Sequence, residues 1–135
     1  MNLKREEKIQ KLLNQYNLSF NSYLREVMHL LLNLKKKKIS DNKLTLLKTK
    51  ENSENILTYY DLLLSERKTA GLELLRQELP KKFSILQAAI ASYDIEETEK
   101  KANEIAVIFD ESLRLLESLF DVHPAIKTTF LKTSG

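Results

Sequence analysis

The chain is 135 residues long, and it has no cysteine and no tryptophan, two glycines and two prolines. Without cysteine it has no disulfide framework, no thiolate metal ligand and no cysteine nucleophile. A fold rich in β-sheet needs many turns, which so few glycines and prolines disfavour. With only two glycines, a glycine-rich loop that holds phosphate groups is not expected. The chain also has no hydrolase or metalloprotease motif. We therefore expect no enzymatic activity and no cofactor.

Long hydrophobic runs are missing as well. The longest one, Val27 to Leu32, is interrupted by His29 and is too short to cross a bilayer. The amino-terminal residues contain no apolar segment of signal-peptide length. The sequence thus predicts a soluble, cytoplasmic protein with no membrane span.

The histidines and charges do not point to a metal, phosphotransfer or nucleic-acid site. The acidic residues of the helix at about 95–120 belong to no E-x-x-H pair, so a di-metal site of the kind found in helical bundles is not expected there. His29 is followed by leucines, whereas a phosphotransfer histidine is usually followed by Lys and Gly. The net charge of +3 is too small to indicate nucleic acid by itself. Residues 1–38 carry nine basic and three acidic side chains, and residues 80–121 carry five and nine. These opposite charges suit either attraction within one bundle or two different partners.

One apolar seam dominates the amino-terminal third. Its residues alternate in steps of four and three, which is the heptad pattern of a helix buried along its whole length: Ile9, Leu13, Tyr16, Phe20, Tyr23, Val27, Leu30 and Leu34. Lys35 to Lys38 follow this seam, either as a solvated helix end or as a docking patch for an anionic partner.

The fold class predicted from these patterns is all-α, an antiparallel helical bundle of one domain spanning residues 1–121. A long, coiled-coil-like hairpin is expected from helices at about 3–38 and 42–79, because the turn at Ser40 and Asp41 is short. Pro80 should end or kink the second helix, and the third helix could begin at Pro80 itself. Two further helices are expected at about 81–92 and 95–120, the latter with a capping box from Asp94 to Glu97. Residues 122–135 are expected to form a short mobile tail.

Two features of these helices remain open at this level. Residues 48–55 are all polar and form either a break in the second helix or a loosely packed turn. The helix at about 95–120 carries a second heptad seam, and additional apolar residues broaden it beyond one face. Such a helix has two buried faces or keeps one face for a partner.

The long hairpin resembles the FlgN-like flagellar export chaperones over roughly residues 8–78. The resemblance rests on a heptad helix with Tyr23-Leu24 and Leu30 to Leu32, the Lys run at 35–38, the turn at Asp41 to Leu44, and the segment from Asn55 to Leu63. It implies a cytosolic, non-enzymatic chaperone that holds hook-filament junction proteins before type III secretion. Such chaperones contact their substrates through carboxyl-terminal amphipathic segments. By position, the partner-binding residues would be Leu113, Leu116, Leu119, Phe120 and Phe130.

The partner implied is a protein with an amphipathic helix, either a secreted flagellar substrate or an export component. Two alternatives to this function stay open. One is a structural protein that forms homo-oligomers through the seam from Ile9 to Leu34. The other is a small helical binding protein of the immunity or antitoxin kind.

Overall fold

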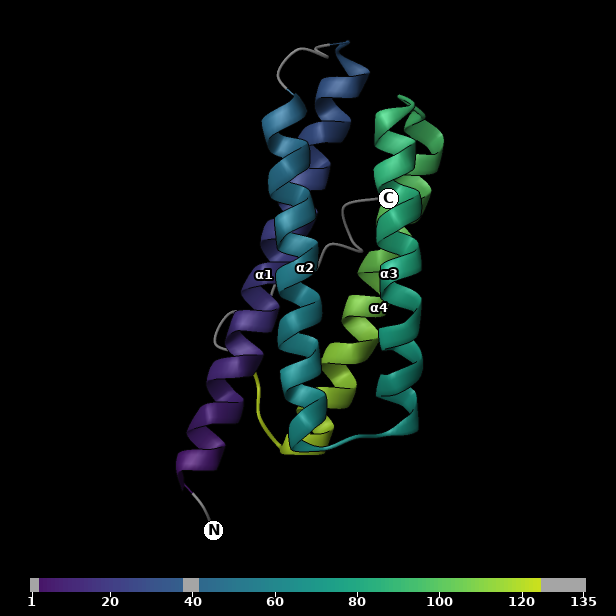
Figure 1. Ribbon diagram of the computed structural model, residues 1–135. Helices are drawn as coiled ribbons and strands as arrows, with labels where there is room; N and C mark the ends of the chain where they lie inside the picture. The colour runs from purple at the N-terminus through teal and green to yellow at the C-terminus, as the bar shows by residue number, and fades with distance from the viewer. Residues whose placement is uncertain (1–2, 38–41, 125–135) are drawn as a thin grey trace.

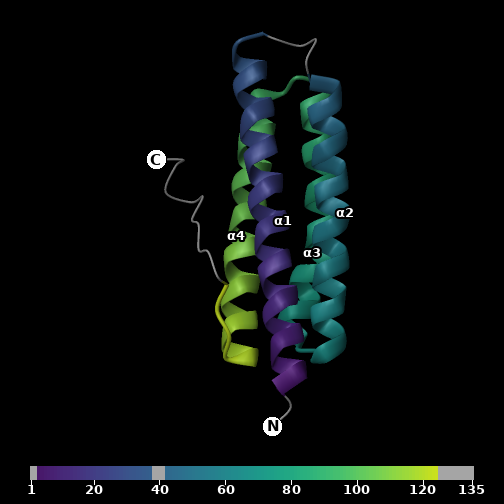
Figure 2. The same cartoon turned by 90° about the vertical axis from the view of Figure 1, so that its left-hand side faces the viewer.

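Four α-helices make up the fold. The computed structural model describes residues 3–37 and 42–124, and within them it contains α1 (Leu3–Lys35), α2 (Asn42–Glu66), α3 (Ala70–Ala91) and α4 (Ile95–Phe120) and no strand. The helices run alternately up and down, each packs against the next one along the chain, and α4 closes the bundle against α1 (Figures 1 and 2). The all-α antiparallel bundle predicted from the sequence is confirmed.

The heptad seam of α1 lies entirely inside this bundle. All eight seam residues are buried, with exposed fractions of 6% or less. Tyr16, Phe20 and Tyr23 meet aromatic rings from the other three helices, namely Tyr60 of α2, Phe83 of α3 and Phe109 of α4. The closest pair is Phe20 and Phe109, whose stacked ring centroids lie 4.3 Å apart. The seam therefore packs within the chain.

The polar segment at 48–55 continues α2 without a break. Thr49 and Ser53 occupy seam positions in a run that reads Leu46, Thr49, Ser53, Ile56, Tyr60 and Leu63, so the heptad spacing is preserved. Both side chains are buried, and both hydroxyls donate to carbonyls of their own helix, at Thr45 and Lys50. Small hydroxyl side chains that bond to the preceding turn can face a core at little cost.

The two ends of the bundle differ in the size of their interior residues. We call the end at which α1 joins α2 and α3 joins α4 the tip end (Figures 1 and 2). Its interior includes small side chains from α2 and α4: Thr49, Ser53, Thr98, Ala102 and Ala106. Larger side chains of α1 and α3, among them Leu30, Leu34, Leu86 and Ile90, are buried at the same end, and the buried aromatic rings lie nearer the middle of the bundle.

The boundary between the second and third helices was predicted wrongly. The structure ends α2 at Glu66 and begins α3 at Ala70, whereas the sequence predicted one helix at about 42–79 and another at 81–92. Thr69 has an extended backbone (φ −133°, ψ 152°), and its hydroxyl accepts from the Leu72 amide, so it caps α3. The Tyr60 hydroxyl also donates to the Leu72 carbonyl, which fastens the start of α3 to α2.

Pro80 was expected to end or kink the second helix or to begin the third, but it lies in the interior of α3. Proline in a helix interior removes a backbone hydrogen bond and costs about 3 kcal/mol. Here the buried face continues through it, with Leu72 and Leu79 before the proline and Phe83, Leu86 and Ile90 after it. Tertiary burial on both sides therefore outweighs the local preference for a break.

The ends of α1 and α4 complete the comparison. The helix α1 ends at Lys35, three residues before the predicted end. The helix α4 spans 95–120 as predicted, and Asp94 caps it by accepting from the Glu97 amide at 3.1 Å. Beyond it, Val122 packs against the core and the His123 carbonyl accepts from Gln10 at 2.7 Å. The packed chain thus extends past the domain limit expected at residue 121.

Candidate interaction surfaces

Two of the predicted partner-binding residues belong to the core. Leu113 and Leu116 are 7% and 1% exposed, and both are members of the main hydrophobic cluster. The reason is that α4 packs against both α1 and α3, so its broad apolar surface is covered from two sides. The broad apolar surface of α4 was explained either by two buried faces or by a face kept for a partner. For Leu113 and Leu116 the structure supports two buried faces. They are not accessible to a partner while the bundle stays closed.

The other predicted residues lie at or beyond the end of α4. Leu119 and Phe120 are half-buried and pack against the edge of the core. Phe130 lies outside the described residues. Leu119 keeps part of its side chain accessible. It could contribute to a partner-binding surface together with exposed apolar side chains beside it.

Such side chains lie where the start of α3 meets the end of α4. A Cβ built on Gly71 would lie 3.4 Å from Leu115 Cδ1, so the two helices meet at this point. Leu74 follows Gly71 by one turn and is 62% exposed; Leu115 precedes Leu119 by one turn and is 41% exposed. We call these four residues, Gly71, Leu74, Leu115 and Leu119, the α3/α4 strip.

Two carboxylates border the α3/α4 strip. Glu78 follows Leu74 by one helical turn and Glu111 precedes Leu115 by one turn, and both side chains are exposed. Within the described part of the chain neither carboxylate forms an ion pair. The strip therefore combines apolar contact area with unneutralised negative charge.

Leu74 is not among the partner-binding residues predicted from the sequence, because the predicted boundary between the second and third helices was wrong. A single helix running to residue 79 would carry the heptad seam of the second helix on to Leu74 and so predict it to be buried. The cap at Thr69 restarts the register, and the buried face of α3 then runs through Leu72 and Leu79, which leaves Leu74 outside. A Thr followed by Ala70 and Gly71 in a leucine-rich segment was the available signal, but Glu is absent from the third helical position, where a capping box would have it.

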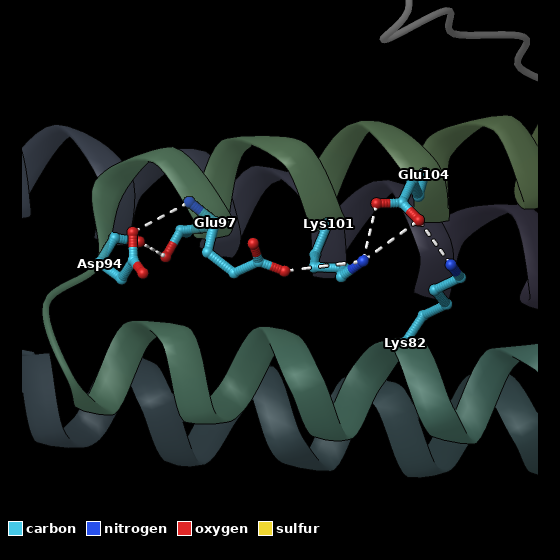
Figure 3. A network of polar contacts seen from close by, with 6 residues as sticks. Lys82, Asp94, Glu97, Lys101 and Glu104 are labelled. Carbon is cyan, nitrogen blue, oxygen red and sulfur yellow. Dashed lines mark hydrogen bonds and ion pairs between the residues drawn. The ribbon is translucent and has the colours of Figure 1, made fainter.

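A polar network joins α3 and α4 near the tip end (Figure 3). Glu104 accepts from Lys82 of α3 at 2.5 Å and from Lys101 of its own helix at 3.0 Å. Lys101 also pairs with Glu97 at 3.6 Å, so the network reaches back to the helix cap at Asp94. The hydrogen bonds from Lys82 and then Lys101 hold the pKa of the Glu104 carboxyl below its usual value. Hydrogen bonding to Glu104 raises the pKa of the Lys101 ammonium in turn.

This network is structural in character. Glu97 and Glu104 each pair with a lysine, and the pKa shifts of Glu104 and Lys101 favour the charged forms that make these contacts. A general acid or base needs a pKa near the working pH. In this network the pKa of Glu104 is lowered and that of Lys101 is raised, so both move away from neutral pH.

Metal binding and membrane crossing have no visible basis in residues 3–37 and 42–124. Within these ranges no three His, Cys, Asp or Glu side chains lie close enough to share a metal ion. His29 is exposed and lies 3.4 Å from the Asn33 amide, and His123 pairs with Glu117 at 2.6 Å. None of the described helices combines the length and apolarity that crossing a membrane requires.

Comparison of the chain with protein-family models, curated protein sequences and solved structures finds no match. The candidate surfaces therefore have to be interpreted from their own chemistry.

Proposed function

We propose that this chain is a non-enzymatic binding protein that holds an amphipathic helix of a protein partner on the α3/α4 strip. The observation that carries the proposal is the pair Leu74 and Leu115, which are 62% and 41% exposed on either side of Gly71. An amphipathic helix presents apolar side chains in steps of three and four residues, and such a row matches leucines arranged along two adjacent helices. Glu78 and Glu111 favour a partner helix with basic residues beside its apolar face.

The specific role proposed is that of a cytoplasmic export chaperone for hook-filament junction proteins of the flagellum. The resemblance of residues 8–78 to FlgN-like chaperones supports it, as does the location of Leu119 in the carboxyl-terminal part of the chain where those proteins bind substrates. The site proposed here differs from the sequence-based one, because Leu74 and Leu115 replace the buried Leu113 and Leu116.

Self-association through the seam from Ile9 to Leu34 is a weaker proposal. Every residue of that seam is buried against other helices of the same chain. An oligomer built on it requires the bundle to open, which would expose the aromatic core.

The test is affinity purification of the tagged chain from its native source, followed by identification of bound proteins. We expect recovery of a flagellar junction protein or an export component, and loss of that protein with the Leu74→Asp/Leu115→Asp variant. Removing two leucine contacts should weaken binding about tenfold or more. Leu18→Asp is the matched control, because Leu18 is 53% exposed on α1, away from the strip.

Two results would contradict the proposal. Recovery of neither a substrate nor an export component would remove the chaperone role. Equal loss of the partner in the Leu18→Asp control would show that the α3/α4 strip is not the binding surface.

A further inference from the structure

The end of the α1/α2 hairpin has an unusual concentration of positive charge. We define the hairpin tip as residues 32–37 of α1 and its end together with residues 43–50 of α2. These residues include six lysines and no acidic residue: Lys35, Lys36, Lys37, Lys43, Lys48 and Lys50. Lys35 pairs with Glu99 of α4. Within the described part of the chain, the other five form no ion pair, and all five are exposed.

The same tip also exposes large apolar side chains. Leu32 is 51% exposed near the end of α1, and Leu44 and Leu47 are 64% and 61% exposed in the first turns of α2. Leu44 and Leu47 lie one helical turn apart on the solvent face of α2, since they are three residues apart in the helix. Exposed leucines beside unpaired lysines indicate a partner that is both anionic and apolar.

The shape of the molecule makes the tip accessible to a flat surface. The carboxyl end of α1 extends past the turn between α3 and α4 in both views (Figures 1 and 2). The exposed acidic residues Asp94 and Glu96, which belong to that turn and to the start of α4, are therefore set back from the end of α1. A planar anionic surface would meet the end of α1, which carries Lys36 and Lys37, before that turn.

The residue types favour a lipid surface over an acidic protein. All six cations are lysines. Arginine is the cation enriched at protein interfaces and suited to bidentate recognition of carboxylates, whereas lysine is depleted there. Clusters of four to eight basic residues beside apolar side chains attract anionic headgroups without fixed geometry, and leucines enter the boundary with the acyl chains. We propose that the hairpin tip binds peripherally to membranes that contain anionic phospholipids.

This proposal does not depend on the α3/α4 strip, because the two surfaces lie at opposite ends of the bundle. The strip is at the start of α3 and the end of α4, and the tip is where α1 joins α2 (Figure 1). A chain that binds lipid at one end leaves the other end available to a protein partner.

The test is flotation of the purified full chain with vesicles of phosphatidylcholine alone or of phosphatidylcholine and phosphatidylglycerol in a two-to-one ratio. We expect binding to the anionic vesicles only, with a partition coefficient that falls as salt rises. Lys36→Glu/Lys37→Glu/Lys43→Glu should lower that coefficient more than about a hundredfold. Leu44→Ser/Leu47→Ser should lower it about tenfold at the same salt concentration.

The matched control is Lys11→Glu/Lys68→Glu/Lys81→Glu. It changes the net charge by the same amount at three exposed lysines outside the tip. Circular dichroism verifies that each variant keeps its helices. Absence of wild-type binding to anionic vesicles at low salt would overturn the proposal, as would equal loss in the control. Binding of an acidic amphipathic peptide without any binding to vesicles would assign the tip to a protein partner instead.

Discussion

At the scale of single residues, the tyrosines of the core differ in how their hydroxyls are satisfied. The Ser112 hydroxyl donates to the Phe109 carbonyl, so Tyr16 donates to Ser112, with 2.6 Å between the two oxygens. The Tyr23 hydroxyl is buried, and within the described residues it has no hydrogen-bond partner. Burial raises the pKa of both phenols, so both stay neutral across the physiological range. The two side chains therefore contribute differently to stability although both are fully buried.

Replacing each of these tyrosines by phenylalanine should change stability in opposite directions. Tyr23→Phe should raise the free energy of unfolding by about 1 kcal/mol, because it removes a hydroxyl that is desolvated in the folded state without gaining a hydrogen bond there. Tyr16→Phe should lower it by about 1 kcal/mol, because a buried hydrogen bond is lost. Urea unfolding of both variants measures the difference. If Tyr23→Phe lowered the free energy of unfolding as much as Tyr16→Phe, the Tyr23 hydroxyl would have to form a stabilising hydrogen bond.

Phe20 tests whether the seam of α1 is the centre of the core. It is fully buried and contacts Tyr16, Tyr23, Phe83 and Phe109. Phe20→Ala should lower the free energy of unfolding by about 3–5 kcal/mol. Leu18→Ala, an exposed position two residues earlier, should change it by less than about 0.5 kcal/mol. A similar small effect at both positions would place Phe20 outside the core.

At the scale of helices, the joint between α2 and α3 shows where local rules fail. Pro80 carries a strong local signal for a break, yet the helix continues because large side chains are buried on both sides of it. Pro80→Ala should raise the free energy of unfolding by about 2 kcal/mol, since the proline penalty exceeds the benefit of a stiffer unfolded chain. Thr69→Ala should lower it by about 1 kcal/mol through loss of the cap. A destabilising Pro80→Ala would imply that the proline geometry is required in α3.

Much of the fold could be predicted from the sequence because heptad spacing reports burial directly. The seam of α1, the limits of α4 and the antiparallel class follow from that spacing and from the Asp94 cap. Two features could not be predicted. Thr49 and Ser53 look polar in sequence but stand at seam positions, where their hydroxyls bond to their own helix. The α3/α4 strip could not be predicted because it depends on which face of α3 is buried. That face is set by residues far along the helix, such as Leu79 and Phe83.

At the scale of the whole molecule, ion pairs join every pair of neighbouring helices. Arg5 and Lys8 of α1 pair with Glu66 of α2, and the other three interfaces are joined by Asp61–Arg76, Lys82–Glu104 and Lys35–Glu99. Exposed pairs of this kind each contribute at most about 1 kcal/mol. Opposite charges at each interface also disfavour packing of the helices in another order. The basic α1 and acidic α4 thus attract each other within one chain.

Acid should weaken this arrangement through two carboxyl groups. Hydrogen bonding to Lys8 lowers the pKa of Glu66, and hydrogen bonding to Lys82 and Lys101 lowers the pKa of Glu104, each from a reference value of 4.5. Lowered pKa values in the folded state mean that both groups stabilise the fold above pH 4.5. That stabilisation is lost as the pH falls through the lowered values. Glu66→Gln/Glu104→Gln should therefore be less stable than wild type at neutral pH, and the difference should shrink in acid.

The matched control for this measurement is Glu51→Gln/Glu54→Gln, which removes two exposed carboxylates of α2 that form no ion pair in the described structure. Its unfolding free energy should follow wild type throughout the titration. A constant difference between wild type and the Glu66/Glu104 variant from neutral pH into acid would contradict the linkage.

The small interior residues at the tip end also have a kinetic consequence. Thr49, Ser53, Thr98 and Ala102 bury less apolar area than Ile56, Tyr60, Phe109 and Leu116 do nearer the opposite end. Backbone amides around 49–53 and 98–102 should therefore exchange with deuterium faster than those around 56–63 and 109–116. Local unfolding of the bundle would then begin at the tip end. The end that opens first carries the exposed lysines and leucines, so it could adapt to an uneven surface while the aromatic centre stays closed.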